Sequence, residues 1–231
     1  MGERPADLRS GAESTIDAPL RALVFDFDGV ILESNECKTD AFRDVFSRFP
    51  EHTETMMAFH RQWQWKSRYF KIDHLVENLL GRRGDTVLRE ELASEFSRRA
   101  LEHLAEVPFV PGAKELLEEF APRVPLYVAS VTPQADLDAT VTVRGLRGFF
   151  RDVYGCPPWT KTGAVADVIR REGCAPSAVA LVGDAPGDLR SAEENGAEFV
   201  GRQSAIAFDP KPARMYPDLF AIADALRPRL Q

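Results

Sequence analysis

Short apolar runs alternate with amphipathic stretches over much of the chain, and this pattern predicts strands that alternate with helices. The first run is Leu23–Phe25, and the later ones are "PLYVAS" (125–130), "FRDVYG" (150–155), "AVALVGD" (178–184) and "AEFVG" (197–201). Helical spacing of apolar residues occupies the segments 113–120, 134–144, 163–172, 188–195 and 219–226. Strands separated by helices are typical of βα units in a parallel sheet. We therefore expect an open α/β sheet of about five strands.

The segment 35–107 has a different pattern, with helical spacing and almost no strand signal. Its clearest parts are "NECKTDAFRDVFSRF", "KIDHLVENLLG" and "TVLREELASEFSRRALEHL", each with apolar residues three or four positions apart. We interpret it as an all-helical domain inserted after the first strand. The predicted organisation is a flexible N-terminal tail at 1–19, a doubly wound Rossmann-like core formed by 20–34 and 108–231, and a helical domain at 35–107.

Composition and charge narrow the class of protein. Of 231 residues, 44% are hydrophobic and 28% are charged, and no apolar run approaches the roughly 18–20 residues that span a bilayer. The net charge of -7 argues against a nucleic-acid binder, because such proteins neutralise phosphates with a basic face. The cysteines are odd in number and form no CxxC pair, so we predict reduced thiols and a cytoplasmic location. They are Cys37, Cys156 and Cys174.

Polar side chains follow four of the predicted strands where the strands end. Asp26 and Asp28 follow the first, Ser130 ends the second, Lys161 comes after the third, and Asp184 ends the fourth. Singly, each is explained as a helix cap, a turn residue or a solvated charge. The carboxyl ends of parallel strands share one crevice, however, and converging carboxylates repel one another unless a cation lies among them. Oxygen ligands suit Mg²⁺, so with a nearby hydroxyl and ammonium the set indicates phosphoryl transfer.

Four motifs in this order resemble the haloacid dehalogenase superfamily of phosphohydrolases. They are "DFDGV" (26–30), Ser130 after an apolar run, Lys161 before a helix, and "GDAPGD", which ends at Asp188. The likeness extends from about residue 20 to the C-terminus, and the helical insertion is similar to the small helical cap of members such as phosphoglycolate phosphatase and β-phosphoglucomutase. Four ordered motifs in a matching strand context are a specific signal.

The resemblance implies separate roles for the two acids of "DFDGV". Asp26 would be the nucleophile that forms an aspartyl-phosphate intermediate. Asp28 would protonate the leaving oxygen and then act as the base that activates water. The dehalogenase branch lacks an acid at the position of Asp28, so a phosphatase is favoured over a dehalogenase. Val30 stands where many members have Thr, a variation that changes none of these roles.

The resemblance also implies a phosphate site and a metal site. Ser130 would bind the transferring phosphoryl group, and Lys161 would balance its charge. Thr132 is the alternative to Ser130, because Val131–Thr132–Pro133 replaces the commoner run that contains Asn.

Mg²⁺ would be bound by the carboxylates of Asp26 and Asp184 and by the backbone carbonyl of Asp28. Asp188 would support the metal or Lys161. These residues are the predicted metal site of the chain.

The segment "HRQWQWKSRYFK" within the helical insertion is a candidate for substrate recognition. Its ordinary explanation is a helix junction with Trp63 and Trp65 packed inward and its basic residues exposed. The functional interpretation is that Arg68, together with Lys66 or Lys71, binds anionic or hydroxyl groups of the substrate. In the superfamily, the cap closes over the site and contacts the leaving group.

Other polar residues of the insertion and its approach receive weaker assignments. Glu33, Asn35 and Lys38 are expected to face the cleft, although Asn35 equally suits a helix cap. The histidines lack the spacing of zinc ligands, and we predict surface positions for all of them. They are His52, His60, His74 and His103.

The function predicted from these observations is Mg²⁺-dependent hydrolysis of a phosphomonoester of a small metabolite, with sugar phosphates as the favoured class. The predicted partner is that phosphorylated metabolite, with no nucleic acid and no membrane, and the chain is expected to be a monomer or a homodimer. One alternative is a phosphomutase of the β-phosphoglucomutase type, which uses Asp26 and Asp28 but returns the phosphoryl group to the sugar. Another is a non-catalytic binding protein on the same fold.

Overall fold

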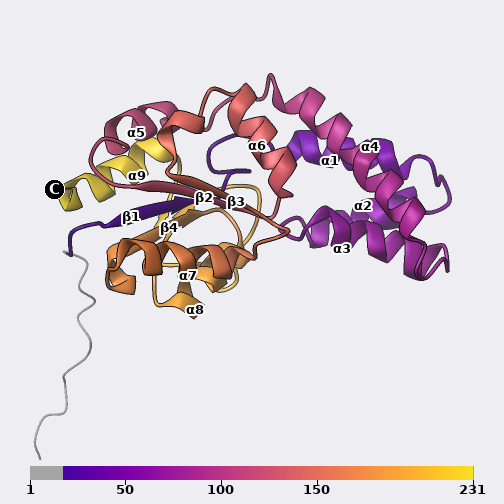
Figure 1. Ribbon diagram of the computed structural model, residues 1–231. Coiled ribbons are helices and arrows are strands. Elements are labelled where there is room, and N and C mark those ends of the chain that lie inside the picture. Colours follow the sequence, from indigo (N-terminus) through magenta and orange to yellow (C-terminus); the bar gives the residue numbers. More distant parts are fainter. Residues whose placement is uncertain (1–17, 231) are drawn as a thin grey trace, which may run out of the picture.

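A parallel sheet of six strands forms the centre of the molecule in the computed structural model, which describes residues 18–230 (Figure 1). The strand order is β3-β2-β1-β4-β5-β6, and every neighbouring pair is parallel. The strands are β1 (Ala22–Phe25), β2 (Leu126–Ser130), β3 (Asp152–Gly155), β4 (Val179–Gly183), β5 (Glu198–Arg202) and β6 (Met215–Tyr216). Most of the tail predicted at 1–19 lies outside the described residues.

Helices cover both faces of the sheet, as expected for strands that are apolar along their whole length (Figure 1). In β1, Leu23 and Phe25 belong to one hydrophobic cluster and Ala22 and Val24 to the other. The first cluster includes α5 (Ala113–Phe120), α6 (Gln134–Val143) and α9 (Leu219–Leu226). The second includes α7 (Lys161–Glu172) and α8 (Pro186–Asn195). The predicted doubly wound α/β fold is confirmed.

One strand was missed. The expected count was about five, and β6 pairs with β5 at the edge of the sheet. It consists of Met215–Tyr216 alone, within "DPKPARMYP", where no apolar run is long enough to indicate a strand. Its pairing depends on the exposed edge of β5, which local sequence does not reveal.

The segment after β1 is helical, and its helices pack on one another at one end of the sheet (Figure 1). They are α1 (Asn35–Phe46), α2 (Thr53–Gln62), α3 (Arg68–Asp73), a π-helical turn (His74–Leu79) and α4 (Thr86–Leu104). In α1 the buried residues are Ala41, Phe42, Val45 and Phe46, at the spacing of a single helix face. None of the helices between residues 18 and 230 combines the length and apolar character that a bilayer span requires.

Two connections join these helices to the rest of the chain, and they lie side by side. Leu32 of the outgoing connection pairs in antiparallel fashion with Phe109 of the returning one. The amide of Glu33 donates to the carbonyl of Pro108 at 3.0 Å, and the amide of Val110 donates to Ile31 at 3.1 Å. Since the outgoing connection starts at the carboxyl end of β1, the helices are held next to that edge of the sheet.

Candidate active site

The turn after β1 places Asp26 at the middle of the carboxyl edge. β1 lies between β2 and β4, and the backbone amide of Asp26 donates to Val182 of β4 at 2.8 Å. The amide of Phe27 donates to Oδ1 of Asp26 at 2.7 Å, which orients the carboxylate. Gly29, three residues after Asp26, has a φ of +74° and lets the chain turn back.

Gly29 is also the point where the backbone comes closest to the acidic side chains. A Cβ at this position would collide with Oδ2 of Asp184 and crowd Nδ2 of Asn35. Gly29→Ala is therefore expected to cost more than the roughly 1–2 kcal/mol of a left-handed alanine, because Asp184 must also move. Urea unfolding measures the loss.

Gly173→Ala is the matched control. Gly173 ends α7 at a φ of +55° with nothing within 4 Å of an added Cβ, so it carries the backbone cost alone. Equal losses of unfolding free energy in the two variants would show that the collision with Asp184 is of no consequence.

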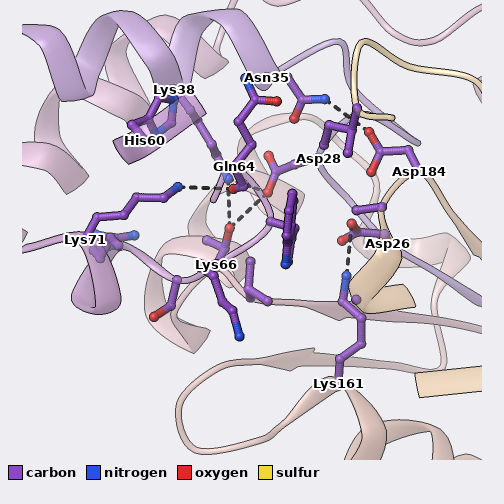
Figure 2. A pocket seen from close by; sticks show the side chains of 18 of the residues that line it. Asp26, Asp28, Asn35, Lys38, His60, Gln64, Lys66, Lys71, Lys161 and Asp184 are labelled. Atoms are coloured by element: carbon purple, nitrogen blue, oxygen red, sulfur yellow. Dashed lines mark hydrogen bonds and ion pairs between the residues drawn. The ribbon is translucent and has the colours of Figure 1, made fainter. Parts of the chain in front are cut away.

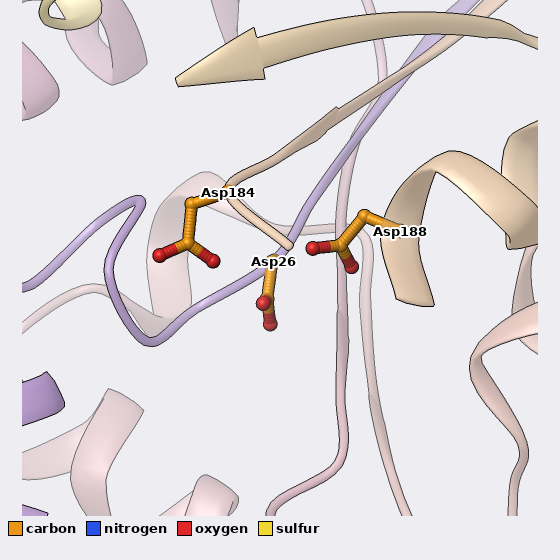
Figure 3. A group of neighbouring side chains, drawn as sticks. All are labelled: Asp26, Asp184 and Asp188. Atoms are coloured by element: carbon orange, nitrogen blue, oxygen red, sulfur yellow. The ribbon is translucent and has the colours of Figure 1, made fainter. Parts of the chain in front are cut away.

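Three carboxylates form a buried cluster at this edge (Figure 3). Asp26 follows β1, Asp184 follows β4 and Asp188 lies in the first turn of α8, and oxygens from all three lie within 4.8 Å of one another. Burial raises the pKa of Asp26 well above its usual range, and Asp188 and Asp184 raise it further, against the opposing effect of Lys161. Burial and the nearby Asp188 raise the pKa of Asp184 to about 6. The cluster thus favours a bound positive charge.

Lys161 supplies part of that charge. Its Nζ lies 3.0 Å from Oδ2 of Asp26 and also bonds to Asp188. Although burial opposes the charged form, Asp188 and Asp26 raise the pKa of Lys161, so the ammonium persists. Lys161 is the first residue of α7 because the Thr160 hydroxyl accepts from the amide of Gly163 at 3.0 Å and caps the helix.

The cluster fits a divalent cation. Three carboxylates face one ammonium, which leaves two negative charges if all are ionised. Hard carboxylate oxygens are the ligands that Mg²⁺ prefers. The carboxylate of Asp184 is further oriented by Nδ2 of Asn35, at 3.1 Å from Oδ2. That Mg²⁺ is bound by Asp26, Asp184 and the backbone carbonyl of Asp28, with Asp188 in support, remains a prediction that this charge balance supports.

Asp28 has different surroundings, and its carboxylate is not part of the cluster. It bonds to the ammonium of Lys38, to the hydroxyl of Ser34 at 2.6 Å and to the hydroxyl of Thr132 at 3.0 Å. Burial by itself would raise the pKa of Asp28, but the Lys38 charge and these hydrogen bonds lower it overall. The carboxylate is therefore held in its ionised form.

A cavity between the sheet edge and the helices contains these groups (Figure 2). Among the predicted residues that line it are Asp26, Asp28, Lys161, Asp184, Asp188 and Arg68. Its volume is about 120 Å³. This is well above the roughly 10–15 Å³ that one bound water needs, so the cavity admits a small ligand.

Comparison with known protein families agrees with this geometry. The family described as haloacid dehalogenase-like hydrolase matches residues 23–202, which include the acidic cluster, Lys161 and the helical insertion. The chain belongs to this hydrolase family. The predicted superfamily, and the prediction of an enzyme, are confirmed.

Relatives of this hydrolase include phosphatases. The phosphoglycolate phosphatase of Synechococcus elongatus is 26% identical over 201 residues, which cover 83% of this chain and 91% of the relative. The structure of CbbY from Rhodobacter sphaeroides with phosphate has a TM-score of 0.72 and 16% identity, over 90% of this chain and 99% of that chain. The structure of YfnB from Bacillus subtilis, bound to magnesium, has a TM-score of 0.68 and 16% identity, over 90% of this chain and 99% of that chain. At this identity the two structures show the shared fold.

Ser130 and Thr132 differ in their access to the cavity of the hydrolase. Ser130 is buried at the end of β2, and its hydroxyl accepts from the amide of Thr132 at 3.1 Å. Thr132 itself lines the cavity and lies between Asp28 and Lys38, whose Nζ donates to its hydroxyl at 2.8 Å. The predicted phosphate-binding role of Ser130 stays a prediction. The alternative, Thr132, is the one of the two whose side chain lines the cavity.

Arg68 lies at the cavity wall, but its guanidinium already has protein partners. It bonds to Asp136 of α6 and to the hydroxyl of Ser97 in α4, and it lies 4.8 Å from the ring centroid of Phe96. Arg68 therefore joins the helical insertion of the hydrolase to its core. Its predicted contact with substrate stays a prediction, and the geometry favours a positioning role.

The surface position predicted for His60 is wrong. The residue is 3% exposed, and Nε2 lies 2.9 Å from the Thr39 hydroxyl. The centroid of the ring lies 4.8 Å from the ring centroid of Phe42. Burial, followed by the charges of Lys71 and Arg61, lowers the pKa of His60 to about 3, so the ring is neutral. The available signal was its position four residues after the buried Met56, on the inner face of α2.

Other residues of the insertion also differ from the simplest expectation. Trp65 lines the cavity and approaches Gly187 of the core, and the centroid of its ring lies 5.7 Å from that of Trp63 in the insertion. Glu33 bonds to Arg202 instead of facing the cavity. Asn35 and Lys38 do line it, as expected. The contact of Lys38 with Asp28 had no signal in the sequence.

Proposed function

We propose that this hydrolase is a Mg²⁺-dependent phosphomonoesterase that uses an aspartyl-phosphate intermediate. The observation that carries the proposal is the position of Asp26, oriented at the centre of the sheet edge, beside Lys161 and two further carboxylates, and facing a cavity of metabolite size. When bound, Mg²⁺ would be held by Asp26 and Asp184 with Asp188 beside them, and would supply the charge that lets a carboxylate approach an anionic phosphoryl group.

Asp26 and Asp28 have different tasks in each of the two chemical steps. An oxygen of Asp26 bonds to phosphorus while the bond from phosphorus to the leaving oxygen breaks. Asp28 is ionised in the free cavity, but a bound phosphate dianion raises its pKa, so it takes up a proton when substrate binds and gives that proton to the leaving oxygen. Asp28 then takes a proton from water as the water attacks phosphorus, which frees Asp26 and releases inorganic phosphate. Lys161 balances the charge of the phosphoryl group throughout.

The proposed substrate is phosphoglycolate or a small sugar phosphate. The phosphoglycolate phosphatase of S. elongatus and the phosphate complex of CbbY support this class. A variant of CbbY with xylulose 1,5-bisphosphate has a TM-score of 0.69 and 16% identity, over 87% of this chain and 95% of that chain. The free state of Cys37, Cys156 and Cys174 supports a reducing compartment such as the cytoplasm.

Phosphate release from a panel of sugar phosphates, nucleotides and phosphoglycolate tests the proposal. Chelation with EDTA is expected to lower turnover by at least about 100-fold, because the uncompensated carboxylates would repel the substrate, and added Mg²⁺ should restore it. Absence of hydrolysis across the panel, or turnover that EDTA leaves unchanged, would refute the proposal. A bisphosphate intermediate without net phosphate release would identify a phosphomutase instead.

A further inference from the structure

The cations that line the cavity are not equally neutralised. Lys161 pairs with Asp26 and Asp188, as described above, and Lys38 pairs with Asp28. Arg68 pairs with Asp136. Lys66 and Lys71 also line the cavity, and neither has a carboxylate within ion-pair distance among residues 18–230.

Lys71 stands apart because its unpaired ammonium is buried. The residue is only 2% exposed, whereas Lys66 is half-buried and lies over the Phe70 ring. Nζ of Lys71 donates to the backbone carbonyl of Gln64 at 3.1 Å and lies 4.7 Å from the ring centroid of Phe42. A carbonyl and an aromatic ring compensate a buried charge far less well than a carboxylate does.

The pKa of Lys71 agrees with a buried charge that lacks a carboxylate partner. Burial, and then the charge of Lys38, lower the pKa of Lys71 to about 7. The neutral ring of His60 lies close enough for Lys71 to affect its pKa, and Nδ1 of that ring is buried without a hydrogen-bond partner among the described residues. Two buried polar groups on the same wall of the cavity thus have unused hydrogen-bonding capacity.

The position of Lys71 relates it to the reaction centre. In Figure 2 its side chain reaches in from α3, on the side of the cavity away from Lys161, with the ammonium turned toward Gln64 and Asp28. Asp26 and Lys161 define where the phosphoryl group reacts, so a ligand that extends from them toward Asp28 brings its leaving-group side to the wall that carries Lys71.

We propose that Lys71 binds a second anionic group of the substrate, a carboxylate or a second phosphate on the leaving-group side. This inference rests on the proposed function of the same cavity. It narrows the substrate class to phosphomonoesters with a negative charge beyond the scissile bond. A charge-assisted hydrogen bond from Lys71 then selects such substrates over neutral phosphomonoesters of the same size.

Calorimetric binding of phosphonates in the presence of Mg²⁺ tests this without requiring turnover. The probes are matched pairs: phosphonoacetate with ethylphosphonate, and 3-phosphonopropionate with propylphosphonate. At least one carboxylate is expected to bind at least about tenfold more tightly than its alkyl partner, the effect of one hydrogen bond to a charged group. Bisphosphonates of the same lengths show whether a second phosphate is preferred to a carboxylate.

The variant Lys71→Met removes the ammonium at nearly constant length and should abolish the preference while leaving alkylphosphonate binding unchanged. Lys211→Met, at an exposed lysine outside the cavity, is the matched control and should keep the preference. If Lys71→Met does not fold, Lys71→Gln retains a donor for the carbonyl of Gln64 and removes only the charge.

The outcomes separate the inference from the proposed function. No preference for any anionic probe in the wild type, or a preference that survives loss of the Lys71 charge, overturns the inference even if the protein hydrolyses an aryl phosphate efficiently. A preference that depends on Lys71 supports it, and the phosphate-release panel then decides separately whether the bound class is hydrolysed.

Discussion

Asp26→Asn is expected to lower kcat for every phosphomonoester by roughly four orders of magnitude or more, because an amide lacks the charge needed to attack phosphorus. Folding should persist. The amide can still accept the hydrogen bond from Phe27, and removing one of three mutually repelling carboxylates favours the metal-free fold. Phosphate release measures the first effect, and urea unfolding without Mg²⁺ measures the second.

Asp167→Asn is the matched control for this prediction. Asp167 is a buried acid in α7 that bonds to Tyr154 at 2.8 Å, and it lies outside the cavity. Its replacement should lower stability and leave kcat within about twofold, since it touches neither substrate nor the acidic cluster. Retention of more than roughly a hundredth of wild-type turnover by Asp26→Asn would contradict the assignment of Asp26 as nucleophile.

Asp28→Asn is expected to have the second-largest effect, with a dependence on the leaving group. For an alkyl phosphate, kcat should fall by about 10²–10⁴-fold, since the leaving oxygen needs a proton. For p-nitrophenyl phosphate, the rate of the first step should change little, because nitrophenolate leaves without needing a proton. The second step still lacks its base, so a burst of nitrophenol equal to the enzyme concentration should precede slow turnover.

The surroundings of Asp28 suit its role as the base of the second step. The Lys38 ammonium and the hydroxyls of Ser34 and Thr132 hold the carboxylate ionised, the form that a base requires. Stopped-flow absorbance detects the burst. Equal loss of turnover for alkyl and aryl phosphates with no burst would show that Asp28 does not transfer protons.

The fold was largely predictable because parallel strands are buried on both faces and therefore appear as continuous apolar runs. The runs 23–25, 125–130 and 178–184 match β1, β2 and β4 to within one residue at each end. A parallel sheet also brings its carboxyl ends to one edge, which is why the sequence alone predicts that Asp26 and Asp184 lie together. β6 had no such signal, because its pairing depends on a neighbour distant in sequence.

The helical insertion was predictable as helices but not as a wall of the cavity. Helical spacing assigned the buried face of α1, yet it did not show that Lys38 on the same helix reaches Asp28 of the core. It also did not show that Arg68 bonds to Asp136 across the junction of the two parts. Both contacts join elements whose relative placement depends on how the insertion docks.

The sequence by itself determined the alternation of strands and helices, the carboxylates and lysine at the sheet edge, and the family. Each of these depends on local periodicity or on residues at strand ends. Only the tertiary structure decided which cations are neutralised: Lys38 and Arg68 have carboxylate partners, and Lys71 is buried with no such partner among residues 18–230. Ion pairing and burial depend on which surfaces meet, and a pattern along one chain segment contains no information about the surface opposite it.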